Sequence, residues 1–221
     1  MSYTLEDAMR DEAYEAMSRE LYPDHRDQAI EEFTSERLQS YYLKNPDVAV
    51  NAVDSYKEAQ SLLEHRHYSA CVVFAVTSIE QFLKAALLRP VVFGLIHMES
   101  LAAIIVDVAM DQNGGIDRYK KLLAGLFKDL LGIDVGAVRR EPSQKPLFDE
   151  VKALQNQRNA VVHRGTKVAE EDARHALEVA NSVFSHVFVH LLAALGLQIV
   201  KGGHIVTAQI QKRDPADLLV S

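Results

Sequence analysis

The residues Tyr68–Leu88 are apolar on nearly every side of a helix, and this stretch constrains the fold more than any other part of the chain. The run Cys71–Val76 is entirely apolar, and the whole stretch contains two charged residues, Glu80 and Lys84. A surface helix needs only one apolar stripe, so a helix that is apolar all round must be covered by neighbours on every side. We therefore expect this helix at the centre of a helical bundle. It is expected to end at Arg89-Pro90, because proline interrupts the hydrogen bonding of a helix.

Helical periodicity extends over most of the remaining chain, which predicts an all-α fold. Proline and glycine separate the helices. Asn45-Pro46 lies between two of them, Asn113-Gly114-Gly115 between two more, and Pro146 is expected to be the first residue of another. The remaining expected helices cover Thr4–Leu21, Asp24–Lys44, Ala49–Leu63, Val91–Gln112, Asp117–Leu131, Pro146–Arg164 and Ala169–Leu195.

The end of the chain predicts a small β-hairpin. Leu197–Val200 and His204–Ile210 are short segments that flank Lys201-Gly202-Gly203. Glycine supplies the positive backbone angles that tight hairpin turns need. We therefore expect two short strands after the last long helix.

The composition favours a protein of the cytoplasm. Of the 221 residues, 48% are hydrophobic and 25% are charged, which is usual for a globular domain. The single cysteine, Cys71, excludes an intrachain disulfide and favours a reducing compartment. The acidic N-terminus does not resemble a signal peptide, and the longest apolar stretches, around Val91–Met110 and Val187–Val200, are interrupted by polar or charged residues. We expect a cytoplasmic protein that has no membrane partner.

The charge is distributed unevenly along the chain. The net charge is −7, and residues 1–50 contain 12 acidic against 5 basic residues, so the rest of the chain is neutral. Within that neutral part, Gly136–Lys167 contains seven basic and three acidic residues. Because salt screens charges within about 8–10 Å, this local excess matters more to a polyanion than the net charge does.

The basic segment contains an unusual helix end, Leu154–Gly165 (LQNQRNAVVHRG). Arg158 falls on the apolar stripe of the helix, Asn159 follows it, and His163 lies five residues after the arginine. One interpretation is capping, because cations near a helix C-terminus interact favourably with the helix dipole, by roughly a few tenths of a kcal/mol each. The other interpretation is a functional site.

The functional interpretation rests on a resemblance. The motif of Arg158, Asn159 and His163 resembles the signature of the HEPN family (higher eukaryotes and prokaryotes nucleotide-binding domains), which is Arg, four to six residues, His, often with Asn, Asp or His directly after the arginine. The upstream helix pair, AVDSYKEAQSLLEHRHYSACVVFAVTSIEQFLKAAL, is similar to the family as well. The resemblance covers about Asp47–Leu88 and Pro146–Leu195.

The resemblance implies an up-and-down helical bundle that dimerises so that two motifs face each other. It divides the chain into an acidic helical extension at 1–46, a HEPN-like bundle at 47–195 with a helical insertion at about 89–145, and a C-terminal hairpin and tail at 196–221. Catalytic members of the family are metal-independent endoribonucleases, many of them in toxin–antitoxin or antiviral systems. Other members have lost activity and bind nucleotides or partner proteins.

The residue types suit RNA cleavage that uses no metal and no cofactor. RNA carries its own nucleophile, the 2′-OH beside the scissile phosphate. Histidine has an ordinary pKa of about 6.5 and exchanges protons near neutrality, and arginine binds phosphate through two parallel hydrogen bonds. The resemblance thus implies that Arg158 clamps the phosphate, His163 transfers the proton and Asn159 supports both, leaving a 2′,3′-cyclic phosphate. The implied partners are RNA, a second copy of the chain, and an antitoxin or defence-system protein.

The spacing of the motif points to a composite site. Five residues at 100° each place Arg158 and His163 about 140° apart around an ideal helix. Both side chains reach one phosphate only if the helix unwinds at His163, which Gly165 would permit, or if a second subunit completes the site.

Residues outside the motif are also candidates for a role at the site. Glu80 either forms a local salt bridge with Lys84 or orders Arg158. His186 and His190 have the spacing of a helical metal pair, but without an evident third ligand a core or interface pair is expected. The residues expected to bind the RNA backbone are Arg164, Lys167 and Lys152.

The sequence also bears on ATP hydrolysis and on the role of the acidic residues 1–46. No glycine-rich phosphate loop is present in the sequence, which argues against ATP hydrolysis. The acidic helices of 1–46 are either solvated packing elements or a cover that restrains the nuclease by lying over the basic segment.

Overall fold

The structure is a computed structural model, and it describes residues 10, 12–17, 33, 35–96, 98–110, 124–125, 127–128, 134, 136–141, 143 and 145–208. These residues are mostly helical and include a small antiparallel sheet of two strands, which confirms the mostly helical fold and the hairpin. Large parts of the predicted helices Thr4–Leu21, Asp24–Lys44 and Asp117–Leu131 lie outside the described residues.

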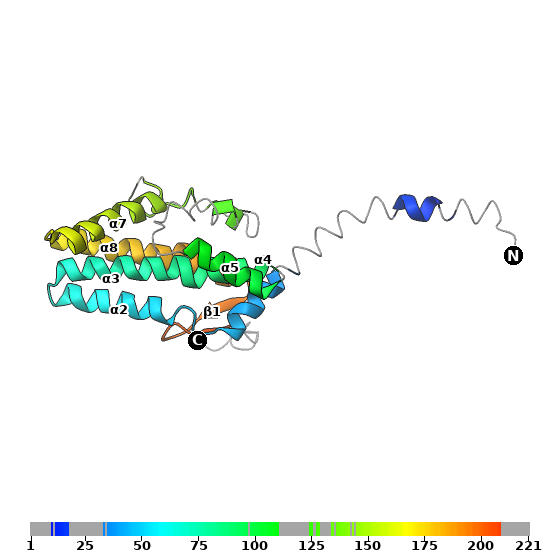
Figure 1. Ribbon diagram of the computed structural model, residues 1–221, viewed down its shortest axis with the longest axis horizontal. Coiled ribbons are helices and arrows are strands. Elements are labelled where there is room, and N and C mark those ends of the chain that lie inside the picture. Colours follow the sequence, from blue (N-terminus) through cyan, green and yellow to red (C-terminus); the bar gives the residue numbers. More distant parts are fainter. Residues whose placement is uncertain are drawn as a thin grey trace, which may run out of the picture.

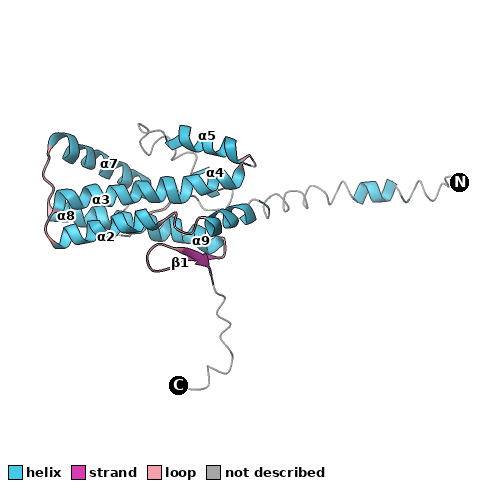
Figure 2. Cartoon of the chain, turned by 60° about the horizontal axis from the view of Figure 1, so that its bottom comes forward, coloured by secondary structure: helices cyan, strands magenta, loops and turns pink. Residues whose placement is uncertain are grey.

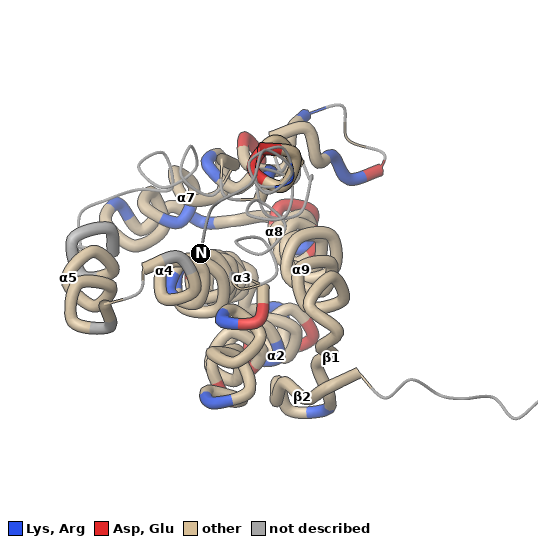
Figure 3. The backbone as a smooth tube through the Cα atoms, turned by 90° about the vertical axis from the view of Figure 1, so that its right-hand side faces the viewer, with Lys and Arg blue, Asp and Glu red and all other residues tan. Residues whose placement is uncertain are grey.

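Four long helices pack side by side, each antiparallel to the one before it (Figure 1). They are α2 (Val50–Glu64), α3 (Tyr68–Gln81), α7 (Leu147–Arg164) and α8 (Glu170–Val183). The α2–α3 turn and the α7–α8 turn lie at the same end of the bundle, where the backbone N–H of Val168 donates to Ser69 Oγ at 3.2 Å. α3 packs against the other three helices, and α2 and α7 lie on opposite sides of it (Figure 3).

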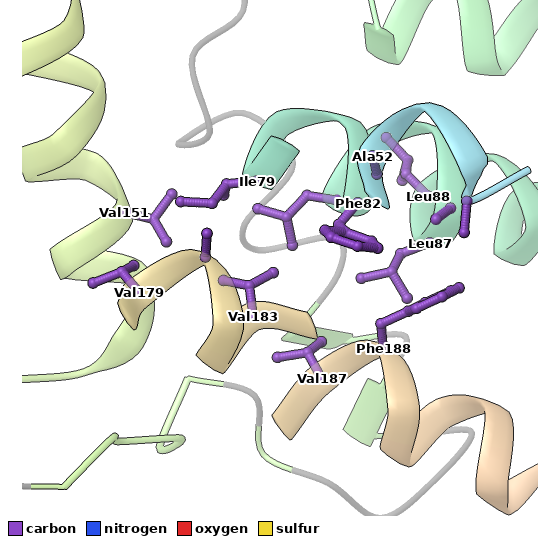
Figure 4. Close-up of a cluster of buried hydrophobic side chains, with 14 of the residues drawn as sticks. Ala52, Ile79, Phe82, Leu87, Leu88, Val151, Val179, Val183, Val187 and Phe188 are labelled. Atoms are coloured by element: carbon purple, nitrogen blue, oxygen red, sulfur yellow. The ribbon is translucent and has the colours of Figure 1, made fainter. Parts of the chain in front are cut away.

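α3 is the central helix of the bundle, as its composition predicts. Figure 4 shows the part of the core where Ile79 of α3, Val151 of α7 and Val183 of α8 come together, and all three side chains are buried. Each such side chain contributes about 1.5–3 kcal/mol when it leaves water. The other buried α3 residues are Cys71, Val72, Ala75, Val76 and Ser78.

The central helix does not end at Arg89-Pro90, so that prediction was wrong. It continues through a π-helical segment, η1 (Phe82–Leu88), into α4 (Arg89–Leu95). Pro90 has no N–H to donate to the carbonyl of Ala86, and a regular helix would leave that carbonyl unpaired. The hydroxyl of Tyr42 donates to it instead, at 2.6 Å. This distant donor and the wider π turn allow the helix to run past the proline.

A break after α4 divides the predicted helix Val91–Gln112, so its prediction as one element was also wrong. Ile96 is extended, with φ −99° and ψ 118°, and α5 (Glu99–Met110) then lies beside α4 (Figure 2). The cation of Arg37 satisfies carbonyl groups at the end of α4. Its guanidinium donates at 3.0–3.3 Å to the carbonyls of Phe93, Gly94 and Ile96.

The last long helix runs unbroken through α8, a second π segment η2 (Phe184–Phe188) and α9 (Val189–Ala194). It confirms the predicted helix Ala169–Leu195 to within one residue at each end. The two π segments pack against each other, and the Phe82 ring lies 5.2 Å from the Phe184 ring and 5.6 Å from the Phe188 ring. These ring pairs stabilise the centre of the bundle beyond simple burial.

Two continuous helices, Tyr68–Gly94 and Glu170–Ala194, have the length and hydropathy of a membrane span. In their most apolar windows, 61% and 56% of the residues are buried inside the bundle. Core helices of a globular bundle meet the same criteria of length and hydropathy. The expectation of a cytoplasmic protein without a membrane partner therefore stays a prediction.

The helical segment 35–44 and the hairpin both pack on the bundle. The segment contributes Leu38 and Tyr42 to the core. The strands β1 (Leu197–Ile199) and β2 (Ile205–Thr207) pair in antiparallel register. The turn between them requires glycine at Gly203, where φ is +93° and an added Cβ would lie 3.0 Å from the backbone of Val50.

Candidate functional site

α7 carries the motif at the end of a complete helix. It begins at Leu147, with Pro146 one residue outside the helix, so the prediction of Pro146 as the first helical residue was wrong by one position. Gly165 ends the helix with a left-handed φ of +65°. The backbone N–H groups of Gly165 and Thr166 donate to carbonyls of the last turn, those of Val161 and Ala160. The helix is therefore regular through Arg164, and it does not unwind at His163.

Arg158 lies on the partly buried side of α7, as the sequence pattern predicts. Its guanidinium Nη1 donates to Asn159 Oδ1 at 3.1 Å. Its Nε is buried and has no hydrogen-bond partner among the described residues. A buried donor without an acceptor costs about 1–3 kcal/mol, so the Nε of Arg158 has a hydrogen bond still to make.

Asn159 and His163 lie on the exposed side of the same helix. They are four residues apart, which places them on one face, whereas Arg158 and His163 are about 140° apart around the axis. Because the helix is regular here, the guanidinium and the imidazole of a single chain do not converge on one point. Of the two arrangements expected from the sequence, unwinding at His163 is excluded, and completion by a second subunit remains.

Glu80 contacts α7 through a glutamine of that helix. Gln155 Nε2 donates to Glu80 Oε1 at 2.9 Å. Gln155 precedes Arg158 by three residues and therefore lies on a neighbouring part of the same helix face. Glu80 thus positions the helix that carries the motif, and sequence reasoning missed Gln155 because no local pattern links residues so far apart in the chain.

The three cations expected to bind RNA are all exposed. Arg164 follows His163 directly and is the last residue of α7. Lys167 lies four residues after His163, in the α7–α8 turn. Lys152 lies eleven residues before His163, which is close to three helical turns and puts both on one face about 16 Å apart. The structure thus gathers Arg164 and Lys167 at the motif and places Lys152 farther along the same face.

The α2–α3 turn lies beside the α7–α8 turn and adds charged groups that the sequence did not reveal. Arg66 has a positive φ of 63°, which residues with a side chain rarely adopt. Its side chain lines an open pocket of about 420 Å³ together with Tyr68, Glu170 and Arg174. Arg174 and the Tyr68 hydroxyl both bind the Glu170 carboxylate and lower its pKa. The Glu170 carboxylate in this pocket is therefore already paired with Arg174 and Tyr68.

A second polar network holds the segment before α7 in place. Arg140 Nε donates to Glu150 Oε2 at 2.9 Å, and the side chains of both residues are largely buried. The other guanidinium nitrogens contact Glu178 Oε2 at 3.0 Å and His175 Nδ1 at 2.7 Å, both on α8. Sequence reasoning assigned Glu150 only to the helix dipole and missed this network, because its members come from three separate segments.

The other sequence candidates have no catalytic arrangement. His186 and His190 are exposed rather than in the core, and their rings stack with centroids 6.5 Å apart. Within the described part of the chain, no group of three or more His, Cys, Asp or Glu side chains could hold a metal ion. Burial raises the pKa of the Cys71 thiol to about 11, so this thiol stays protonated and is a poor nucleophile near neutrality.

Comparisons with protein-family models, with curated proteins and with solved structures found no match to the chain.

Proposed function

We propose that the chain is a metal-independent endoribonuclease of the HEPN type that acts as a homodimer. Arg158 of one protomer and the partner subunit's His163 would meet at a single phosphate of the RNA. The observation that carries this proposal is the buried Nε of Arg158, which has no acceptor among the described residues. A phosphate oxygen is the acceptor that a guanidinium binds best.

The proposed chemistry needs one base and one acid. His163 removes the proton of the 2′-OH, and the 2′-oxygen then attacks phosphorus while the bond to the 5′-oxygen breaks. The protonated imidazole of the same His163 then gives that proton to the 5′-oxygen, and the products are a 2′,3′-cyclic phosphate and a 5′-hydroxyl. Arg158 stabilises the negative charge on the phosphate oxygens, and Asn159 holds the guanidinium through the 3.1 Å hydrogen bond.

The surface around the motif supports dimerisation. Val162 precedes His163 and is 52% exposed, although it is apolar. Phe74 on the adjoining helix α3 is 38% exposed. α3 and α7 run antiparallel, so these residues lie at similar levels of the bundle, close to the end that carries the motif. Apolar and aromatic side chains are typical of the centre of an interface between subunits.

The test is RNA cleavage in the presence of EDTA. We expect the wild-type chain to cut single-stranded RNA, and Arg158→Ala and His163→Ala each to slow cleavage by about a hundredfold or more. His186→Ala is the matched control, because His186 is an exposed histidine outside the motif, and it should cleave at the wild-type rate. Cleavage that survives in both motif variants, or that disappears on chelation, would contradict the proposal.

A second candidate is a non-catalytic HEPN module that binds nucleotide, RNA or a partner protein. It is favoured by the apolar side chains on α5, where Leu101 and Ile104 are exposed among the described residues. Such a module would bind RNA in a strongly salt-dependent way, or bind a partner such as an antitoxin or a defence-system protein, without cutting RNA. The cleavage assay therefore separates the two candidates.

A further inference from the structure

A second cavity lies between the helical segment 35–44 and the start of α4, away from the motif. It has a volume of about 380 Å³, and its polar lining consists of the cations Arg37, Lys44 and Arg89 together with Ser40 and Asn45. Tyr41 and Phe93 supply the aromatic part of the wall. No Asp or Glu is among the described residues that line it. This volume lies within the range of small-molecule pockets, and the pocket is positively charged in a chain whose net charge is −7.

The three cations have different roles. Arg37 is fixed by its hydrogen bonds to the end of α4, and so it adds a positive charge to the wall but has few donors left for a ligand. Lys44 and Arg89 are exposed, and neither forms a hydrogen bond or an ion pair with another residue that the structure describes. Two such cations at one pocket favour a ligand that carries at least one negative group, because an anion relieves their mutual repulsion.

The aromatic residues form a wall that is suited to a planar ring. The Tyr41 and Phe93 ring centroids lie 5.2 Å apart, and the ring planes are inclined by 35°. Both side chains are only partly buried, so ring surface remains open to the pocket. Arg89 lines the same pocket as this aromatic wall, and its positive charge opposes the rise that burial causes in the pKa of Tyr41.

The π segment sets the position of Arg89. Arg89 is the first residue after η1, and Phe93 follows it by one turn of α4. A π turn carries more residues than an α turn, so it changes which side chains face a given direction after it. π segments often occur at functional sites. The hydrogen bond from Tyr42 to Ala86 joins this segment to the helix that carries Tyr41 and Lys44.

We propose that this pocket binds a phosphorylated small molecule, with its phosphate between Lys44 and Arg89 and a planar ring against Tyr41 and Phe93. The site is separate from the motif. Ser69 lies beside the α7–α8 turn, and Arg89 follows twenty residues later along a continuous helix, which corresponds to about 30 Å. The proposal does not depend on nuclease activity.

The test is calorimetric titration of the full chain with four probes: ADP, UDP, inorganic pyrophosphate and adenosine. We expect ADP or UDP to bind more tightly than pyrophosphate, and adenosine to show no binding. Lys44→Gln and Arg89→Gln should each weaken the nucleotide by about tenfold, because each removes one charge-assisted contact with phosphate. Phe93→Leu should weaken the nucleotide but leave pyrophosphate unchanged.

Two control variants make the result specific. Lys57→Gln changes an exposed lysine of α2 that does not line the pocket, and it should bind as the wild type does. Arg158→Ala should also bind as the wild type does, which separates this pocket from the motif. The proposal is overturned if none of the phosphorylated probes binds at millimolar concentration, or if Lys57→Gln weakens binding as much as Arg89→Gln. It is equally overturned if pyrophosphate binds as tightly as ADP and UDP.

Discussion

At the scale of single residues, the Tyr42 hydroxyl joins two parts of the molecule. It is fully buried, and it donates to the carbonyl of Ala86, to which Pro90 has no N–H to donate. Burial raises the pKa of Tyr42 well above its usual range, so the hydroxyl keeps its proton and remains a donor at any ordinary pH. One oxygen atom thus connects the helical segment 35–44 to the interior of the central helix.

We expect Tyr42→Phe to lower the free energy of unfolding by about 0.5–1.5 kcal/mol, because it removes a buried hydrogen bond while the ring is kept. Chemical denaturation measures the change. Tyr41→Phe is the matched control, since it removes a hydroxyl from the adjacent, partly exposed tyrosine, and a change within about 0.5 kcal/mol is expected. Equal effects of the two variants would show that the hydrogen bond to Ala86 contributes little.

The residue scale also shows which parts of the candidate site were predictable. Arg158 was expected on the inner stripe and Gly165 at the helix end, and both lie there because periodicity and capping are local properties of the sequence. The buried Nε of Arg158 could not be foreseen, since the burial of one atom depends on how several helices pack. The hydrogen bond from Gln155 to Glu80 was missed for the same reason.

At the scale of elements, the network around Arg140 connects three separate segments of the chain. It links the segment before α7 to the first turn of α7 and to α8. Glu150 is only 5% exposed, so its carboxylate depends on the neighbouring guanidinium for compensation. The network therefore fixes where the motif helix begins.

We expect Arg140→Met to lower the free energy of unfolding by about 3–5 kcal/mol, because it leaves the buried Glu150 carboxylate without its cation. The double variant Arg140→Met with Glu150→Met should lose less than the single variant, since it removes both charges. Thermal and urea unfolding measure both changes. Arg139→Met serves as the control at the adjacent exposed position. If the double variant has a lower free energy of unfolding than Arg140→Met alone, the expected coupling is contradicted.

The elements also show where sequence reasoning failed. The helix expected at Ala49–Leu63 was confirmed because one amphipathic stripe defines it. The helix end expected at Arg89-Pro90 was wrong because the donor that compensates for the proline is Tyr42, 44 positions from Ala86 in the sequence. The break between α4 and α5 was missed because Arg37, on another helix, satisfies the end of α4. Local patterns predict helices, whereas distant side chains decide where some of them stop.

At the scale of the whole molecule, a site shared between subunits makes a specific prediction for mixed dimers. Arg158→Ala and His163→Ala are each expected to be inactive alone. If Arg158 acts with the partner's His163, a dimer that contains one chain of each variant has one intact site and one doubly defective site. Mixing the two variants under exchange conditions should therefore restore cleavage, to about a quarter of the wild-type rate for random pairing.

The same mixture separates the two possible architectures. A site built within one chain stays defective in every pairing, so the mixture would remain as inactive as its components. Sedimentation of each variant alone serves as the control, because both substitutions must leave the dimer intact. A mixture that remains inactive although mixed dimers form would rule out sharing of the site between chains.

The π segment η1 makes the central helix tolerant of a change in length. A π turn is closed by a hydrogen bond to the fifth preceding residue rather than the fourth, so it holds more residues than an α turn. Deletion of one residue between Phe82 and Leu88 would let this stretch close as an ordinary α-helix, and the lost residue would be largely absorbed within the segment. Arg89 and Phe93 would then keep their side of the helix. In a regular α-helix such as α2, the same deletion would turn everything after it by about 100°. Shortening the chain by one amino acid is therefore expected to be less disruptive in η1 than in α2.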